Sequence, residues 1–343
     1  MHPVAPAARF REIDAFRGIA ALWVVLFHYG WRFTTPPFPG HSPVGWGLDV
    51  ERWIAGNLPD FGLLPVFWFF MISGFVIIWT LERSATWRDF VLSRAARLFP
   101  VYWAAVTLSF ATGLLAVDAW DDVSLRQFLV NLTMLQEIVG VRMVDGAYWS
   151  LTVELLFYVG MLALFALGWL KHLRLVCLVW VLGCIATSVL PLIGFEMPWR
   201  VQTYLLLRYG HFLIAGMMFY QLWRGQTGAT PFALLALCVV SIACAYSAGD
   251  ALICCGFLVL FGLAISGRLG FLATAPLLWL GSVSYALYVS HQMIGYHLMA
   301  WMQGIGWPRE VQIVLALGAM LAMADVLTRV IERPARRAIL RRA

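Results

Sequence analysis

Long apolar runs with few charged residues recur along almost the whole of this 343-residue sequence. Runs of about 20 apolar residues have the length that a helix needs to cross the roughly 30 Å hydrocarbon layer of a membrane. We place predicted spans at 12–33, 61–81, 98–117, 149–170, 174–194, 203–223, 231–248, 251–267, 277–299 and 310–331. The pattern predicts an all-α fold, a polytopic bundle of about ten transmembrane helices. We expect one integral membrane domain over residues 1–343.

The composition agrees with lipid as the main solvent of this chain. Hydrophobic residues make up 62% and charged residues only 12%, whereas soluble domains carry about 25% charged residues. The net charge of +6 raises the question of nucleic acid. The arginines, however, lie between the apolar runs and at the C-terminal end, as flanks of membrane helices do, and no long basic, aromatic-interleaved segment occurs. We therefore expect membrane lipid as a partner and no nucleic acid.

The basic residues between the spans also predict the orientation of the chain. If the N-terminus is cytoplasmic, most of the arginine and lysine residues between spans fall on the cytoplasmic side, as the positive-inside rule requires. Both termini are then expected in the cytoplasm. Two segments fit no span. Residues 124–140 are amphipathic and either lie in the interface or re-enter the protein. The aromatic, Pro-rich loop from Phe33 to Asp60 either helps to form an acceptor site or is a simple connector.

The first predicted span carries ionisable residues at two depths. In "EIDAFRGIAALWVVLFHYG", Arg17 and His28 are eleven positions apart, which places them on almost the same helix face and roughly 16 Å apart along the axis. Asp14 lies one turn before Arg17. Arg17 alone would be explained by snorkelling and His28 by a neutral core histidine. Because buried ionisable groups tend to face a cavity or a partner, the shared face favours a site, with His28 as base or nucleophile.

Two further segments place charge in or beside predicted spans. Arg94 and Arg97 are one turn apart, and two guanidiniums on one face suit phosphate groups, although ordinary flanking charge gives the same pattern. Glu154 is a carboxylate within the fourth span, where it is costly unless paired. It could pair with Arg17, hold His28 in one tautomer or contact a substrate, and structural pairing is the preferred interpretation.

The ninth and tenth spans contain two more polar groups of residues. Asp325 and Arg329 are four positions apart and are expected to neutralise each other as a structural pair. In the ninth span, hydroxyl and imidazole side chains recur every three or four residues and form a polar stripe that continues toward the middle of the membrane: Ser284, Tyr285, Tyr288 and His291.

The stretch "DAFRGIAALWVVLFH" resembles the opening of the acyltransferase-3 family of integral membrane acyltransferases, whose signature is Arg, ten residues, His. Five further segments match family motifs in the same order: "FFMISGF" (69–75), "SRAARLFPVYW" (93–103), "YWSLTVELLFY" (148–158), "GSVSYALYVSHQMI" (281–294) and "IERPARR" (331–337). Each motif alone is weak, but six in order over nearly the whole chain are specific.

The resemblance implies an O-acyltransferase that moves an acyl group, acetyl in the first instance, from cytoplasmic acyl-CoA to a hydroxyl of a cell-surface carbohydrate or glycolipid. It implies a location in the bacterial inner membrane. No metal is expected, because the histidines show no HExxH or carboxylate–histidine spacing. The residues expected in catalysis are His28, Arg17, Asp14 and Glu154. Those expected to bind acyl-CoA are Arg94, Arg97 and Tyr102, and those expected beside the acceptor are Trp149, Ser150, Tyr285, Tyr288 and His291.

Three alternatives stay open at this stage. The acceptor is a small molecule such as an antibiotic in some family members. A proton-coupled secondary transporter would also use intramembrane ionisable residues, but the inverted repeats and paired broken helices of transporters are not evident here. His28 acts either as a general base in a ternary complex or as a nucleophile that forms an acyl-imidazole, and the sequence does not separate these two roles.

Overall fold

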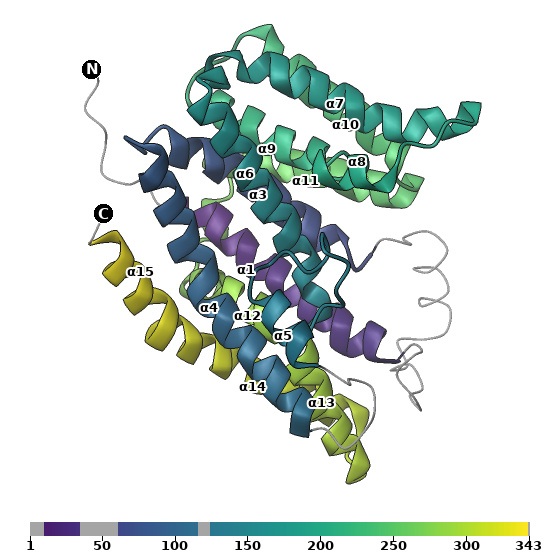
Figure 1. The fold of residues 1–343 in the computed structure, drawn as a ribbon, viewed down its shortest axis with the longest axis vertical. Helices are drawn as coiled ribbons and strands as arrows, with labels where there is room; N and C mark the ends of the chain where they lie inside the picture. Colours follow the sequence, from purple (N-terminus) through teal and green to yellow (C-terminus); the bar gives the residue numbers. More distant parts are fainter. Residues whose placement is uncertain (1–9, 35–60, 116–123, 342–343) are drawn as a thin grey trace.

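The computed structural model describes residues 10–34, 61–115 and 124–341, which are helical apart from turns and short connections (Figure 1). No strand occurs within these ranges, so the prediction of an all-α fold is confirmed for them. In chain order the elements are α1 (Arg11–Leu26), η1 (Phe27–Trp31), η2 (Arg32–Thr34), α3 (Leu64–Leu81), α4 (Trp87–Leu115), α5 (Leu125–Asn131), η3 (Gly146–Tyr148), α6 (Trp149–Ala166), η4 (Trp169–His172), α7 (Leu173–Val189), η5 (Leu190–Ile193), α8 (Trp199–Tyr204), α9 (Gly210–Trp223), α10 (Ala229–Ala245), α11 (Ala248–Ile265), η6 (Gly270–Leu272), α12 (Ala275–Ser290), α13 (Gln292–Gly304), α14 (Arg309–Leu327), η7 (Thr328–Glu332) and α15 (Arg333–Leu340).

Seven helical stretches of the described chain are long and apolar enough to cross a membrane: Arg11–Trp31, Leu64–Leu81, Trp87–Leu115, Gly146–Ala166, Trp169–Ile193, Ala248–Ile265 and Arg309–Leu340. They correspond to seven of the ten predicted spans. The other three predicted spans correspond to shorter helices. Residues 231–248 cover most of α10, residues 203–223 are divided between α8 and α9, and residues 277–299 are divided between α12 and α13.

Glycines allow close contact between α1 and α12, one of the two most extensively packed helix pairs. A Cβ atom on Gly18 would lie 2.7 Å from the backbone nitrogen of Gly281, and one on Gly281 would overlap the carbonyl oxygen of Asp14. Small residues permit such close approach of membrane helices. The contact holds the first turns of α1, including Arg17, directly against α12.

Glycines also allow close contact between α3 and α9, the other extensively packed helix pair. A Cβ atom on Gly74 would overlap the carbonyl oxygen of Leu213, and one on Gly216 would overlap that of Met71. Gly74 belongs to the "FFMISGF" segment. The segment therefore serves close helix packing on one face of α3.

Residues 124–140 form α5 and a series of turns that pack into the protein beside α4 and α6. The hydroxyl of Tyr102 on α4 donates to the carbonyl of Asn131 at 2.6 Å, and that of Thr152 on α6 donates to the carbonyl of Met134 at 2.9 Å. Asn131 is fully buried. Of the Phe33–Asp60 loop, residues 35–60 lie outside the described residues, and with them the prediction of an acceptor site there.

The two ends of α1 lie on opposite sides of the bundle. In Figure 1 the start of α1 lies toward the left-hand side, as do α15 and the first turns of α4, whereas the end of α1 lies at the right. The site described next extends between these two sides.

Candidate functional site

A cavity of about 110 Å³ lies between α1, α3, α4, α6 and α12. Apolar side chains of α3 form one wall, and polar side chains of the other four helices face it. Seven of the residues predicted for the site line this cavity together: Arg17, Arg94, Arg97, Glu154, Ser150, Tyr285 and Tyr288. Residues that are up to 271 positions apart in the sequence, from Arg17 to Tyr288, thus meet in one place.

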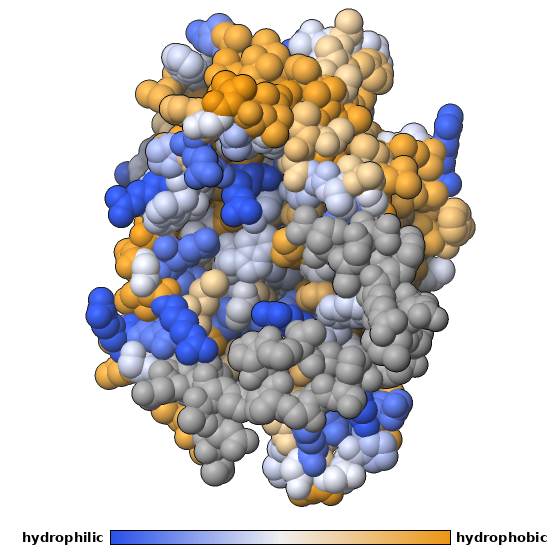
Figure 2. Space-filling view, turned by 90° about the vertical axis from the view of Figure 1, so that its right-hand side faces the viewer, coloured by the Kyte–Doolittle hydropathy of each residue, from blue (hydrophilic) through white to orange (hydrophobic). Residues whose placement is uncertain are grey.

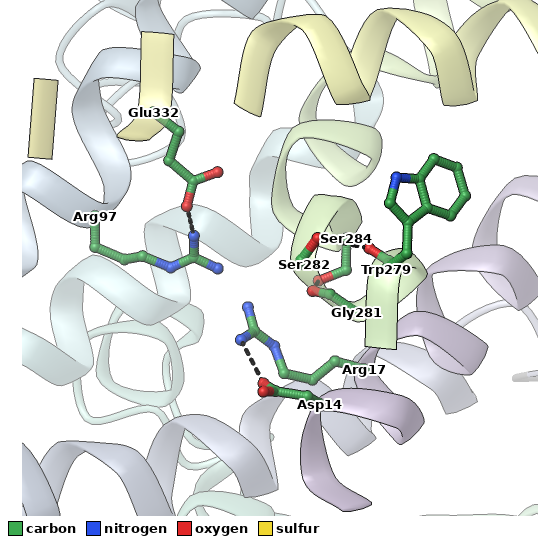
Figure 3. A network of polar contacts seen from close by, with 8 residues as sticks. All are labelled: Asp14, Arg17, Arg97, Trp279, Gly281, Ser282, Ser284 and Glu332. Carbon is green, nitrogen blue, oxygen red and sulfur yellow. Dashed lines mark hydrogen bonds and ion pairs between the residues drawn. The ribbon is translucent and has the colours of Figure 1, made fainter. Parts of the chain in front are cut away.

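Two of the cavity arginines face one another, each with a carboxylate on its far side (Figure 3). The guanidinium of Arg17 lies 3.7 Å from the carboxylate of Asp14, one turn earlier on α1. The guanidinium of Arg97 forms an ion pair and hydrogen bond with Glu332 and lies 4.9 Å from the centre of the Tyr285 ring. Each of these two guanidiniums therefore has a carboxylate as counter-charge.

Glu332 was not among the residues predicted for the site. It lies at the end of the π-helical turn η7, and only 6% of its surface is exposed. Its Oε1 atom binds Arg97, while Oε2 is buried and has no hydrogen-bond partner among the described residues. The segment "IERPARR" signals this position through its Glu-x-Pro motif, but no sequence pattern links it to an arginine 235 positions away.

Arg94 differs from the other two cavity arginines. Its guanidinium lies 5.7 Å from the centre of the Tyr158 ring and donates to the hydroxyl of Ser93 at 3.2 Å. No carboxylate of the described residues lies within ion-pair distance of Arg94, and its buried Nε atom has no hydrogen-bond partner among them. Arg94 therefore has the donor capacity and the charge to bind an anion at the cavity.

Glu154 lines the cavity without an arginine partner within ion-pair distance among the described residues. Its carboxylate accepts hydrogen bonds from the hydroxyl of Tyr158 on the same helix and from that of Ser73 on α3, the latter at 3.3 Å. Beside it, the hydroxyls of Ser150 and Tyr288 lie 2.6 Å apart. The pairing of Glu154 is thus with hydroxyl groups, and Ser73 of the "FFMISGF" segment supplies one of them.

His28 lies at the other end of α1, in the π-helical turn η1. Its Nδ1 atom is 2.8 Å from the carbonyl oxygen of Val24. Because a carbonyl oxygen only accepts, Nδ1 carries the proton and the lone pair of a neutral ring is on Nε2. The ring is only partly buried. π-helical turns are frequent at functional sites.

His291, at the junction of α12 and α13, is the neighbour of His28. Its Nδ1 atom lies 2.8 Å from the carbonyl oxygen of Tyr288, so the same argument puts the proton on Nδ1 and the lone pair on Nε2. That Nε2 atom is 3.2 Å from Nδ1 of His28. The Nδ1–H of His28 therefore points toward two acceptors, a carbonyl oxygen and an imidazole nitrogen. Both would stabilise a positive charge on His28.

The cavity and His28 are adjacent parts of one arrangement, although His28 is not among the residues that line the cavity. Tyr288 connects them, since its side chain lines the cavity and its ring centre lies 6.0 Å from that of His291. The ring centres of His291 and His28 are 4.9 Å apart. Along α1, Arg17 and His28 are separated by roughly 16 Å, so the site has a guanidinium end and an imidazole end.

Two other residues predicted for the site lie beside it. Tyr102 does not line the cavity; it stacks edge-on against Tyr148 with 5.0 Å between ring centres. Trp149 packs between Phe70 and Tyr209. Their predicted roles in binding remain predictions.

The ion pair predicted between Asp325 and Arg329 forms at 2.7 Å. Within the described ranges, no group of three or more His, Cys, Asp or Glu side chains is arranged to hold a metal ion.

The comparisons with known proteins give one match. The family model described as an acyltransferase domain, of the acyltransferase-3 type, matches residues 10–329. No curated protein and no solved structure matches the chain.

Proposed function

Because the chain belongs to the acyltransferase-3 family and is an integral membrane protein, we propose that it is an acyl-CoA-dependent O-acyltransferase. In this proposal an acyl group, acetyl in the first instance, moves from cytoplasmic acyl-CoA to a hydroxyl of a cell-surface carbohydrate or glycolipid. The proposal places the protein in a bacterial inner membrane as a single catalytic domain with both termini in the cytoplasm.

The observation that carries the proposal is the distance between the guanidinium end and the imidazole end of the site. Acyl-CoA has anionic phosphates at one end of a long, flexible pantetheine arm and a thioester at the other. Arg94 supports binding of the phosphates because no carboxylate of the described residues neutralises it. A thioester beside His28 would then lie the length of eleven helical residues, about 16 Å, from Arg17.

The same geometry separates the roles of the arginines. Arg97 is already bound to Glu332, and Arg17 lies near Asp14, so we assign these two to shaping the cavity and setting its potential. Arg94 is the direct phosphate contact, since guanidiniums bind phosphate oxygens through charge-assisted hydrogen bonds. Because Arg17 and Asp14 lie near the opposite end of α1 from His28, we place them at the donor end and not at the reacting carbonyl, together with Glu154, which lines the same cavity as Arg17.

In the proposed reaction, Nε2 of His28 removes the proton from the acceptor hydroxyl as its oxygen attacks the thioester carbonyl. The imidazolium that forms is stabilised through Nδ1–H, which faces the carbonyl of Val24 and Nε2 of His291. Collapse of the tetrahedral intermediate breaks the C–S bond, and the thiolate of CoA takes up the proton from His28. The products are the acyl ester and free CoA.

The first test is donor binding by the purified full chain, measured by calorimetry with acetyl-CoA. We expect saturable binding that Arg94→Ala weakens at least about tenfold, because one charge-assisted hydrogen bond contributes roughly 1.5–3 kcal/mol. Arg126→Ala, at an exposed arginine of α5, is the matched control and should bind like the wild type. Absence of acetyl-CoA binding would instead favour the transporter interpretation.

A second test separates the two possible roles of His28. Radiolabelled acetyl-CoA is incubated with the protein without acceptor, and the protein is then separated from free label. A general base leaves no label on the chain. Label that is retained in the wild type and lost in His28→Ala would show an acyl-imidazole at Nε2 and would replace the proposed direct transfer.

A further inference from the structure

The consecutive helices α6 and α7 are joined by the short η4 element but do not pack along one another. α7 packs mainly on α10, and also on α9. Figure 1 shows α7 and α10 together at the top of the molecule, apart from the helices that enclose the arginine cavity. The separation leaves a gap between the facing sides of α6 and α7.

A cavity of about 960 Å³ occupies this gap, which is at the upper end of the range of ligand pockets. Each helix presents apolar residues to it at intervals of three or four positions, so one face of each is involved. These are Leu156, Phe157, Gly160, Met161, Leu164 and Leu167 on α6 and the turn after it, and Val176, Val179, Trp180 and Gly183 on α7. Figure 2 shows apolar side chains over the upper part of the molecule, the level at which α7 lies in Figure 1.

One end of this apolar cavity is basic. Lys171 and His172 of η4 line it there, together with Trp169. Lys171 and His172 also line a second, polar cavity of about 510 Å³, which Arg174 enters from the start of α7. The two cavities therefore adjoin at η4, with a long apolar part on one side and cationic side chains on the other.

The cations at this junction are not neutralised by the protein. Arg174 donates to the side-chain oxygens of Gln221 and Gln226, at 2.9 and 2.8 Å, and both are neutral groups. No carboxylate of the described residues lies within ion-pair distance of Lys171 or Arg174. Glu82, the carboxylate that lines the polar cavity, is 3.5 Å from Arg224 and accepts from the hydroxyl of Tyr220.

We propose that this pair of cavities binds one anionic phospholipid, with an acyl chain between α6 and α7 and the headgroup phosphate at Lys171 and Arg174. An apolar slot that ends in two unneutralised cations is complementary to a molecule with a hydrocarbon chain and one negative headgroup. The site is distinct from the arginine cavity, because α6 presents Glu154 and Tyr158 to that cavity and Phe157 and Met161 to this one. The inference does not depend on the proposed acyl transfer.

The test uses the full chain in nanodiscs of equal parts phosphatidylglycerol and phosphatidylcholine, and native mass spectrometry counts the lipids retained after release. We expect one retained phosphatidylglycerol. Gly160→Phe should abolish it, since a Cβ atom at Gly160 meets no heavy atom within 4 Å and the ring can fill the slot. Gly256→Phe is the matched control, because Gly256 is an exposed glycine of α11 with the same open surroundings.

The headgroup contact has its own pair of variants. Lys171→Glu with Arg174→Glu should lower retention of phosphatidylglycerol at least about tenfold, as expected from the loss of charge-assisted hydrogen bonds. Arg268→Glu, at an exposed arginine after α11, should leave retention unchanged. Equal retention of phosphatidylcholine, unchanged retention in Gly160→Phe, or a dimer mass that only Gly160→Phe abolishes would each overturn the proposal.

Discussion

Replacing Arg97 with alanine leaves Glu332 buried without its cation, and this is the most quantitative prediction of the structure. Glu332 is 6% exposed, and its second oxygen has no hydrogen-bond partner among the described residues. Breaking a buried ion pair from one side typically costs about 3–5 kcal/mol because an uncompensated charge stays behind. We expect a loss of that size in the free energy of unfolding for Arg97→Ala.

Replacing both partners should cost far less. The double variant Arg97→Met with Glu332→Leu removes both charges and keeps most of the volume, and such exchanges are often close to neutral. The exposed pair of Glu82 and Arg224, which lies outside the membrane-crossing stretches, gives the control. The Arg224 side chain is 53% exposed, so Arg224→Ala should lose no more than about 1 kcal/mol.

The assay is reversible unfolding of the full chain in mixed micelles, as a function of the mole fraction of sodium dodecyl sulfate, followed by tryptophan fluorescence. The expected order of stability places Arg97→Ala well below both Arg224→Ala and the double variant. Equal losses in Arg97→Ala and Arg224→Ala, or a double variant as unstable as Arg97→Ala, would refute the buried-charge argument.

The remaining predictions concern the two ends of the site. Gly18→Leu should separate α1 from α12 and abolish transfer, as measured by turnover assays. Gly30→Leu is the control for folding, because a Cβ atom there meets nothing within 4 Å, and gel filtration should show a folded protein at the wild-type expression level. Arg94→Lys keeps the charge but loses the bidentate geometry, so its KM for acetyl-CoA should lie between those of the wild type and Arg94→Ala. His291→Ala should lower kcat and leave the affinity for acetyl-CoA unchanged, because it removes an acceptor for Nδ1–H of His28; a changed affinity with unchanged kcat would contradict that role.

The parts of the site that the sequence predicts are those held by local spacing. Asp14 and Arg17 are three positions apart, and helical geometry alone brings them together. Glu332 with Arg97 and His291 with His28 are pairs separated by 235 and 263 positions. Spacing within one helix carries no information on which helices meet, so these pairs appear only in the folded chain.

The helix boundaries show a similar limit. Hydropathy predicts one span over 203–223, but the chain turns between α8 and α9 at Leu206, which has a φ of 54°. Three consecutive leucines, 205–207, open that turn, so mean hydropathy does not separate it from the helices on either side. The span over 277–299 is divided at His291, directly after Ser290, whose hydroxyl donates to the carbonyl of Ala286 at 2.7 Å. Such back-bonding by serine often bends helices, but a hydropathy pattern does not reveal the bend when the serine lies within an apolar run.

Single-turnover transfer by His28→Ala is the measurement that tests the central claim most directly. The purified variant and the wild type are saturated with radiolabelled acetyl-CoA and mixed with a hydroxyl acceptor that the wild type acetylates. We predict that the variant binds acetyl-CoA as the wild type does and transfers at least about 100-fold more slowly, since a positioned general base typically contributes 10²–10⁴-fold. Transfer by the variant at nearly the wild-type rate would contradict the account.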